Sequence, residues 1–287
     1  MKEQDFIKII KNQTKSKFIG DDCAYLPDLG IVVTQDNFVE DIHFKREWAT
    51  PYQIGYKAAA VNISDVLASG AKPAYITVGL SLSNDTDNNF IKEFYDGITA
   101  GSYGAQVIGG DITAADKIFT SITAIGKTNG RQISSRCGAK AGYKIITHGN
   151  YGESKKGYED LKRGLKSSNF IRTHLEPKLE PEFSEAISCN IKEEYAMMDT
   201  SDGLADALYK IAEASNVTIN TKNIEGIYGF EDYHLVAAVP QDFLTCLNSD
   251  KYYVIGDVCD YKGYLLDING KLFDDYNQLN TYNHFMK

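Results

Sequence analysis

The sequence lacks the features that mark several large classes of protein. Its cysteines number five, an odd count, and show no Cys-x-x-Cys spacing, so neither a disulfide framework nor a zinc site is expected. Acidic residues outnumber basic ones by 39 to 30, and the net charge of −9 argues against an electrostatic nucleic-acid binder. No apolar run approaches the ~20 residues that cross a bilayer, and residues 1–5 lack the apolar core of a signal peptide. We therefore expect a cytoplasmic protein with no nucleic-acid and no membrane partner.

The 287 residues are enough for one large or two ordinary domains, and their apolar periodicity predicts alternating strands and helices. The predicted helices cover residues 2–12, 51–70, 87–103, 155–166 and 182–190, with another from residue 204. The predicted strands cover residues 31–33, 73–82, 105–111, 118–126, 143–148 and 195–198. Residues 172–181, which contain two prolines, are expected to form a connector, and the domain boundary is expected near residues 134–142.

Carboxylates follow two of the predicted strands. Asp36 comes soon after the run Ile31–Val33, with His43 seven residues later. Asp111 follows Gly109 and Gly110 at the end of the strand over 105–111, which is expected to be buried. Strand ends are where α/β proteins gather their ligands, because the sheet aims side chains that loops surround. A hairpin turn at the glycines is the alternative, although residues 112–116 make a long gap for a two-residue turn.

Two further acidic positions lie in the first half. The adjacent carboxylates of Asp21 and Asp22 repel, so their turn is either fully solvated or compensated by a cation. In the helix predicted over 51–70, Asn62 and Asp65 lie on a different face from the apolar stripe. This pair is either part of an exposed face or reaches into a site.

The second half repeats the theme. The strand over 195–198 is followed by Asp199, Ser201 and Asp202 before a helix that begins near Leu204. A Ser or Asp at this position is most often a helix cap, but two aspartates exceed what capping requires. The backbone N–H groups of the helix start could also help to hold an anion.

Six motifs occur in an order and spacing that resemble the thiamine-monophosphate kinase family. This family belongs to the superfamily of aminoimidazole ribonucleotide synthetase and selenophosphate synthetase. The motifs are Gly20-Asp21-Asp22, Thr34-Gln35-Asp36 with His43, Asn62-Ile63-Ser64-Asp65, Gly109-Gly110-Asp111, Ser135 to Lys140, and Asp199 to Leu204. Near the terminus, Glu231-Asp232-Tyr233 and Tyr282-Asn283-His284-Phe285 extend the resemblance.

The resemblance implies an α/β (α+β) protein with the two-domain aminoimidazole ribonucleotide synthetase-like fold. Residues 1–141 would form an N-terminal domain that binds ATP and metal, and residues 142–287 a C-terminal α/β domain. The N-terminal sheets of two subunits would form a shared β-barrel, so a homodimer is expected. The implied reaction transfers the γ-phosphoryl group of ATP to thiamine monophosphate with several Mg²⁺ ions.

The resemblance also assigns roles to residues. The implied Mg²⁺ ligands are Asp22, Thr34, Gln35, Asp36, Asp65, Asp111, Asp199 and Asp202. The implied ATP contacts are Tyr95, Gly110, Asp111, Arg136 and Ser201. The implied contacts to thiamine monophosphate are His43, Glu231 and Tyr282. Before Glu231, the residues Tyr228, Gly229 and Phe230 stand where the family usually has Ser-Gly-Gly, so this loop is expected to be reshaped.

The chemistry of these residue types agrees with phosphoryl transfer. Transfer between two phosphates brings negative charges together, and clustered carboxylates that bind Mg²⁺ would neutralise them. The attacking phosphate oxygen is already ionised, so no side chain is assigned as a catalytic base. Arg136 could donate a fork of hydrogen bonds to an ATP phosphate.

Other functions share part of this pattern. A sister enzyme such as an amidine-forming synthetase would have the aspartates but not the terminus around Tyr282. Selenophosphate synthetase fits less well, because no cysteine lies in a glycine-rich N-terminal loop. A non-catalytic subunit that binds metal or nucleotide is the third alternative, and the presence of all six aspartates argues against it.

Overall fold

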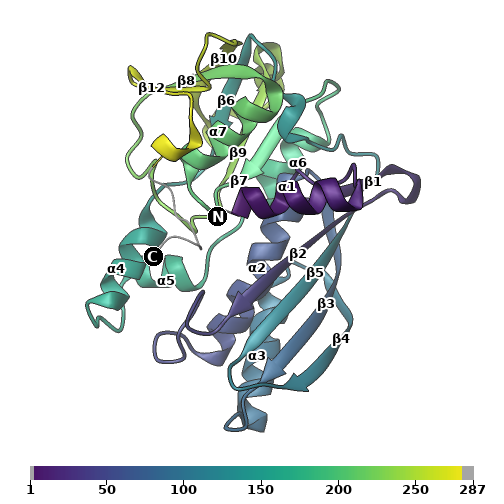
Figure 1. The fold of residues 1–287 in the computed structure, drawn as a ribbon, viewed down its shortest axis with the longest axis vertical. Helices are drawn as coiled ribbons and strands as arrows, with labels where there is room; N and C mark the ends of the chain where they lie inside the picture. Colours follow the sequence, from purple (N-terminus) through teal and green to yellow (C-terminus); the bar gives the residue numbers. More distant parts are fainter. Residues whose placement is uncertain (1–2, 280–287) are drawn as a thin grey trace.

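A computed structural model of the chain describes residues 3–279, which are organised around two β-sheets (Figure 1). The first sheet has the strand order β1-β2-β5-β3-β4. Its strands are β1 (Ala24–Leu26), β2 (Ile31–Val39), β3 (Lys72–Leu82), β4 (Gln106–Ala114) and β5 (Phe119–Lys127). The second sheet has the order β12-β11-β8-β10-β6-β9-β7. Its strands are β6 (Tyr143–Thr147), β7 (Ala196–Asp199), β8 (Val217–Thr221), β9 (Leu235–Pro240), β10 (Tyr253–Asp260), β11 (Leu266–Ile268) and β12 (Lys271–Phe273).

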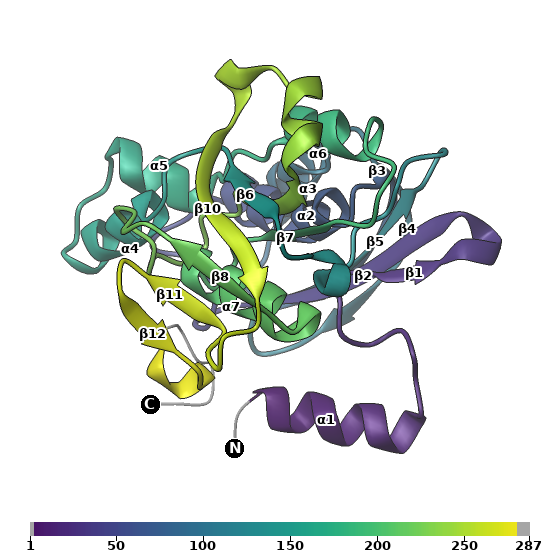
Figure 2. The same cartoon turned by 90° about the horizontal axis from the view of Figure 1, so that it is seen from above.

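Helices cover both sheets. The α-helices are α1 (Glu3–Thr14), α2 (Pro51–Ala68), α3 (Asn88–Gly101), α4 (Glu153–Lys162), α5 (Asn169–Leu175), α6 (Pro181–Ser188) and α7 (Leu204–Ser215). Short 3₁₀ turns lie at Pro27–Leu29, Arg136–Gly138, Gln241–Cys246, Ser249–Lys251 and Tyr276–Gln278. Helices α2 and α3 cover one face of the first sheet, α7 packs on the second sheet, and α1 lies apart from the main body (Figures 1 and 2). No helix within residues 3–279 is long and apolar enough to cross a membrane.

Two strand ends and one connector were predicted wrongly. β2 does not stop before Asp36 but continues to Val39, because its whole length pairs with β5. β4 likewise continues past Asp111 to Ala114, because it pairs in parallel with β3. It is also not buried as expected but exposed along its whole length, because it is the edge strand of the sheet. Since β3 separates β4 from β5, the glycines do not form a hairpin turn. The expected connector over 172–181 begins inside α5, whose Ser168 cap and buried apolar residues extend the helix to Leu175.

Helix α2 lies where the two sheets meet. Its apolar residues belong to a core that is continuous with the second sheet, so that Ile63 of α2 and Met197 of β7 share one cluster. Its outer side packs very closely on α3, because glycines replace side chains at the contact. A Cβ atom on Gly55 would lie 2.0 Å from the carbonyl oxygen of Phe94, and one on Gly97 would lie 2.0 Å from that of Tyr52.

The expected domain boundary falls between the two sheets. The first sheet ends at Lys127 and the second begins at Tyr143, so the boundary after residue 141 lies at the end of the connecting loop. The apolar core crosses this boundary. The division into two domains therefore stays a prediction about folding units.

The contact between α2 and α3 predicts a large effect of a single methyl group. Gly97→Ala should lower the free energy of unfolding by about 1–3 kcal/mol, because the added Cβ must displace the backbone of α2. Urea unfolding measures this change. Gly79→Ala is the matched control, since its Cβ would lie 3.5 Å from the oxygen of Ser121, an ordinary contact. Equal unfolding midpoints for the two variants would contradict the packing argument.

Candidate active site

The polar residues of α2 connect this helix to both sheets. Asn62 Oδ1 accepts a hydrogen bond of 2.8 Å from the backbone N–H of Asp36 in β2. Asp65 Oδ2 accepts one of 2.7 Å from the hydroxyl of Thr34, also in β2. Ser64 Oγ donates to Asp199 at the end of β7 in the second sheet. The face with Asn62 and Asp65 is therefore a site face and not an exposed one.

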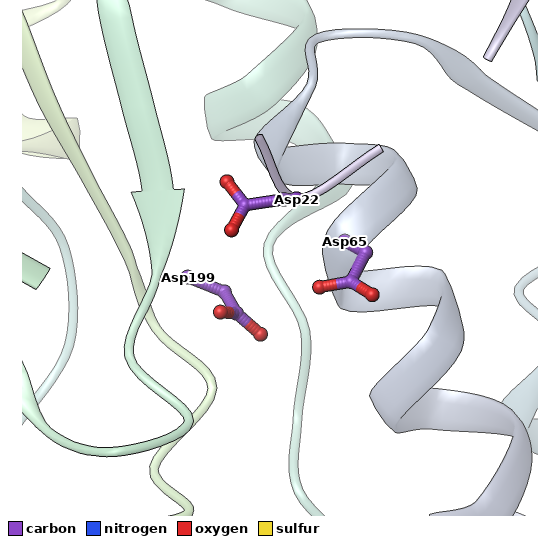
Figure 3. A group of neighbouring side chains, drawn as sticks. All are labelled: Asp22, Asp65 and Asp199. Atoms are coloured by element: carbon purple, nitrogen blue, oxygen red, sulfur yellow. The ribbon is translucent and has the colours of Figure 1, made fainter. Parts of the chain in front are cut away.

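Three carboxylates meet beside this face. Asp22 comes from the loop before β1, Asp65 from α2 and Asp199 from β7, and their side chains point toward one another (Figure 3). One oxygen of each lies within 4.8 Å of one oxygen of the others. Groups that are far apart in the sequence are thus brought within the reach of a single cation.

The electrostatics of this cluster favour a bound cation. Burial raises the pKa of Asp65 well above its usual value, and the charges of Asp36, Asp199 and Asp22 raise it further. Burial and the charge of Asp22 also raise the pKa of Asp199, to about 7. Asp36 acts on both groups and so belongs to the same charged region. Hard divalent cations such as Mg²⁺ prefer carboxylate oxygens, so the donor set fits this metal.

Two cations border the cluster. The guanidinium of Arg136 lies 2.5 Å from Asp22 Oδ1, and its Nε is buried without a hydrogen-bond partner among the described residues. Lys210 of α7 lies 3.2 Å from Asp202 and 2.7 Å from Asp206. Asp202 therefore pairs with Lys210 at the edge of the site and is not one of the three converging carboxylates. The capping pattern in the sequence shows neither the partial burial of Asp202 nor that Lys210 lies beside it.

The remaining metal and ATP candidates are dispersed. Gln35 lies on the opposite face of β2 from Asp36, where its side chain accepts a hydrogen bond of 2.9 Å from Thr123. Tyr95 of α3 packs its ring edge-on against Phe94. Gly110 and Asp111 lie on the exposed edge strand β4, three strands from β2, which corresponds to about 14 Å. In the described part of the chain, these residues are not joined to the three carboxylates.

A second group lies around Glu231. The backbone N–H of Glu231 donates a hydrogen bond of 2.6 Å to the carbonyl of Ser201, in the loop that follows Asp199. Its carboxylate lies 3.1 Å from the ammonium of Lys57 in α2. His43 is held by the backbone N–H of Val39, which donates to its Nδ1 over 3.1 Å, and its ring is close enough to act on the pKa of Glu231. His43 and Glu231 therefore face one region next to the carboxylates.

Aromatic rings line the same region. Tyr158 of α4 contacts three rings, at centroid distances of 5.9 Å to Trp48, 5.8 Å to His174 and 5.5 Å to Phe230. Trp48, Tyr158 and Phe230 are all half-buried. Phe230 belongs to the loop that was expected to be reshaped. Partly exposed rings beside a carboxylate suit a flat, positively charged ligand. The third expected contact, Tyr282, lies outside the described residues.

Sequence reasoning missed several residues of the site. Ser64 lies within the motif from Asn62 to Asp65, but no role is predicted for its hydroxyl. Lys57 and His174 were missed because lysine and histidine in a helix usually face solvent, whereas both side chains here are 3% exposed. Lys210 follows Asp206 by four residues, a spacing that could have indicated the ion pair.

Comparisons with known proteins agree with this arrangement. Residues 20–128 match the model of the family described as AIR synthase related protein, N-terminal domain. The thiamine-monophosphate kinase of Bacillus subtilis is 38% identical over 214 residues, which are 70% of this chain and 65% of that protein. The match thus spans slightly less than two thirds of that relative. The kinase of Synechococcus elongatus is 30% identical over 274 residues, which are 85% of this chain and 84% of that one.

Comparisons with solved structures agree with these sequence comparisons. The structure of AaThiL complexed with AMPPCP and TMP has a TM-score of 0.88 and 27% identity, and covers 99% of this chain and 97% of that chain. The thiamine-monophosphate kinase of Aquifex aeolicus has a TM-score of 0.81 and 27% identity, with 96% and 100% covered. Hydrogenase maturation protein HypE in complex with ATP, at 19% identity and a TM-score of 0.66, shares the fold.

The raised pKa of Asp199 predicts how the metal-free protein responds to pH. Because its folded pKa of about 7 exceeds its unfolded value, this group favours folding below about pH 4 and loses that contribution as the pH rises through 7. Asp199→Asn should therefore raise the free energy of unfolding by about 1–3 kcal/mol near pH 8 in chelator, and by less near pH 5. Urea unfolding at both pH values checks the difference.

With excess Mg²⁺ the wild type should instead be more stable than Asp199→Asn, because Mg²⁺ stabilises the wild type and not the variant. The control is Asp28→Asn, an exposed carboxylate outside the cluster. If Mg²⁺ stabilises wild type and Asp199→Asn equally, the cluster is not the binding site.

Proposed function

Because the chain belongs to the thiamine-monophosphate kinase family, we propose that it transfers the γ-phosphoryl group of ATP to thiamine monophosphate. The products are ADP and thiamine diphosphate. The observation that carries this proposal is the convergence of Asp22, Asp65 and Asp199 from both halves of the chain within 4.8 Å. The acceptor region around Glu231 adjoins this cluster through the hydrogen bond to Ser201.

The carboxylates would hold Mg²⁺. Asp22, Asp36, Asp65 and Asp199 are the proposed ligands, with Asp202 and the oxygens of Thr34 and Gln35 nearby. Mg²⁺, when bound, neutralises the phosphate charge that develops during transfer. In its absence these carboxylates repel one another, as the raised pKa values of Asp65 and Asp199 indicate.

The protein's own groups position the two phosphates. Arg136 is the proposed donor to ATP, because its guanidinium is anchored on Asp22 and still has a buried N–H without a partner among the described residues. Ser201, Gly110 and Tyr95 are the other proposed ATP contacts. The acceptor oxygen is ionised near neutral pH, so no side chain acts as a base and alignment is what the protein supplies.

Glu231 and His43 are the proposed contacts for the acceptor, together with Tyr282. Thiamine carries a permanently charged thiazolium ring. A carboxylate beside half-buried aromatic rings offers this cation both an opposite charge and π-faces. The free thiols of all five cysteines fit a reducing compartment, so we place the reaction in the cytoplasm.

We further propose a homodimer that joins the first sheets of two chains into a β-barrel. The support is the edge strand β4, which is exposed along its whole length, including Val107 (42%), Ile108 (55%) and Ile112 (61%). A long apolar edge strand of this kind normally pairs with another chain.

Such a dimer also explains why Asp111 lies away from the three carboxylates of its own chain. This residue is level with Gly79 and is one step out of register with Asp36, so its side chain lies on the opposite face of its own sheet. We therefore propose that Asp111 serves the cluster of the second subunit.

The first test is a direct assay. Purified protein with Mg²⁺ and ATP should release ADP only when thiamine monophosphate is present, and chromatography should detect thiamine diphosphate. Thiamine without a phosphate is the substrate control, and Asp36→Asn is the protein control, with turnover reduced at least about 100-fold. ADP release that does not depend on thiamine monophosphate would point to a sister synthetase, and no release at all to a non-catalytic subunit.

The second test mixes inactive subunits. Asp36→Asn and Asp111→Asn should each be nearly inactive, whereas co-expressed heterodimers should recover about a quarter to a half of wild-type activity. One site of the heterodimer then has Asp36 from one chain and Asp111 from the other, both intact. Co-expression of Asp36→Asn with Asp65→Asn is the control, because both residues belong to the same chain's site. If the first pair recovers no more activity than the control pair, the shared-site proposal is wrong.

A further inference from the structure

Helix α2 contains a buried lysine that the proposed chemistry does not use. The side chain of Lys57 is 3% exposed, and its Nζ lies 3.1 Å from Glu231 Oε2. Among the described residues, Nζ has no well-aligned hydrogen bond, so this ion pair is its polar contact. Burial lowers the pKa of Lys57, and the carboxylate of Glu231 counteracts this effect. A buried ammonium with a single partner adds little to stability, so the fold alone does not account for it.

Glu231 is contacted from three elements. Lys57 approaches from α2, and His174 of α5 places its Nδ1 at 3.6 Å from the same carboxylate oxygen. His43, after β2, is the third titratable neighbour. Ser154 contacts Nδ1 of His174 at 2.9 Å and so holds this ring. Because burial and the charge of Lys57 lower the pKa of His174 to about 3, the ring is neutral near pH 7. Lys57 is therefore the buried positive charge that faces Glu231.

Of Glu231, Lys57 and His174, only Glu231 is accessible to a ligand. The side chain of Glu231 is 21% exposed, whereas those of Lys57 and His174 are each 3% exposed. Lys57 can thus act on a ligand only through Glu231. Along α2, Lys57 precedes Asp65 by eight residues, or about 12 Å. The helix therefore sets the spacing between the Glu231 group and the carboxylate cluster.

We propose that Lys57 is a positioning residue for the acceptor: it keeps Glu231 ionised and oriented toward the cationic ring of the substrate. The inference rests on the proposed function, since it takes thiamine monophosphate as the acceptor. Helix α2 then has two roles: Asp65 faces the metal cluster, and Lys57 acts toward the organic part of the acceptor.

The physical reason lies in the balance of effects on Glu231. Burial is the largest effect on its pKa and opposes ionisation, while the charge of Lys57 is the largest effect that favours it, and the net result is a lowered pKa. Without Lys57 the effect of burial has less to oppose it, so the pKa of Glu231 rises and a larger fraction of the carboxyl is protonated near neutral pH. A neutral carboxyl no longer attracts a cation. Raising the pH ionises it again and restores the attraction.

The test is the kinetics of Lys57→Met, which keeps the length of the side chain and removes the charge. Near pH 7, its KM for thiamine monophosphate should rise at least about tenfold, while the KM for ATP stays within about twofold of wild type. As the pH is raised toward 9, the ratio of the variant's KM for thiamine monophosphate to that of the wild type should fall toward one. Lys92→Met, an exposed lysine on α3, is the matched control and should behave as wild type.

Two further variants separate positioning from a structural role. Glu231→Gln should show the raised KM without the recovery at high pH, and Lys57→Met/Glu231→Gln should equal Glu231→Gln within about twofold. The double variant has no buried charge in the pair, so this comparison stands even if Lys57→Met does not fold. A double variant whose KM for thiamine monophosphate is much higher than that of Glu231→Gln would overturn the inference.

The inference also fails if Lys57→Met leaves the KM for thiamine monophosphate unchanged, or raises both KM values equally at every pH. These outcomes require a wild type that phosphorylates thiamine monophosphate. A wild type that does not use this acceptor refutes the proposed function itself, and the two failures are thereby distinguished.

Discussion

Repulsion among buried carboxylates is the constraint on which the rest of this structure depends. Asp22, Asp65 and Asp199 lie within 4.8 Å of one another, and burial raises the pKa of the latter two. A fold gains nothing from such an arrangement by itself, because each ionised group loses hydration and meets like charges. Their approach must therefore be enforced by the surrounding packing and relieved by a cation when the protein acts.

Helix α2 provides that enforcement. Its apolar side belongs to a core that extends from the first sheet to the second, and its glycine contacts fix it on α3. The polar side then has little freedom, so Asn62, Ser64 and Asp65 hold β2 and β7 at a set distance. The stability of the packed helix offsets the electrostatic cost of the site. This division explains why the helix is almost entirely buried although it contains charged and polar residues.

The sequence predicts the elements of this fold better than it predicts the geometry of the site. Helix α2 and the aspartates after the predicted strands can be predicted from the sequence, because apolar periodicity and motif order are local properties. The ends of β2 and β4 were missed because they depend on pairing with β5 and β3, which local residues do not encode. Lys57 was missed for a similar reason, since its ion-pair partner, Glu231, lies 174 positions away in the chain. Asp111 shows the limit most clearly, because its neighbours within one chain do not account for its assigned role.

The two halves of the site are joined by one close loop contact. The N–H of Glu231 donates to the carbonyl of Ser201 over 2.6 Å, and a Cβ on Gly203 would lie 2.2 Å from the oxygen of Gly229. Gly203 has a φ of +104°, which favours glycine, so the loops that contain Asp199 and Glu231 can pack this closely only with glycine there. Since these loops are in direct backbone contact, a ligand that orders Glu231 also restrains Ser201 and the aspartates beside it. Under the proposed function, recognition of the acceptor and organisation of the cation site are therefore mechanically linked, and the link passes through backbone groups that side-chain substitutions leave intact.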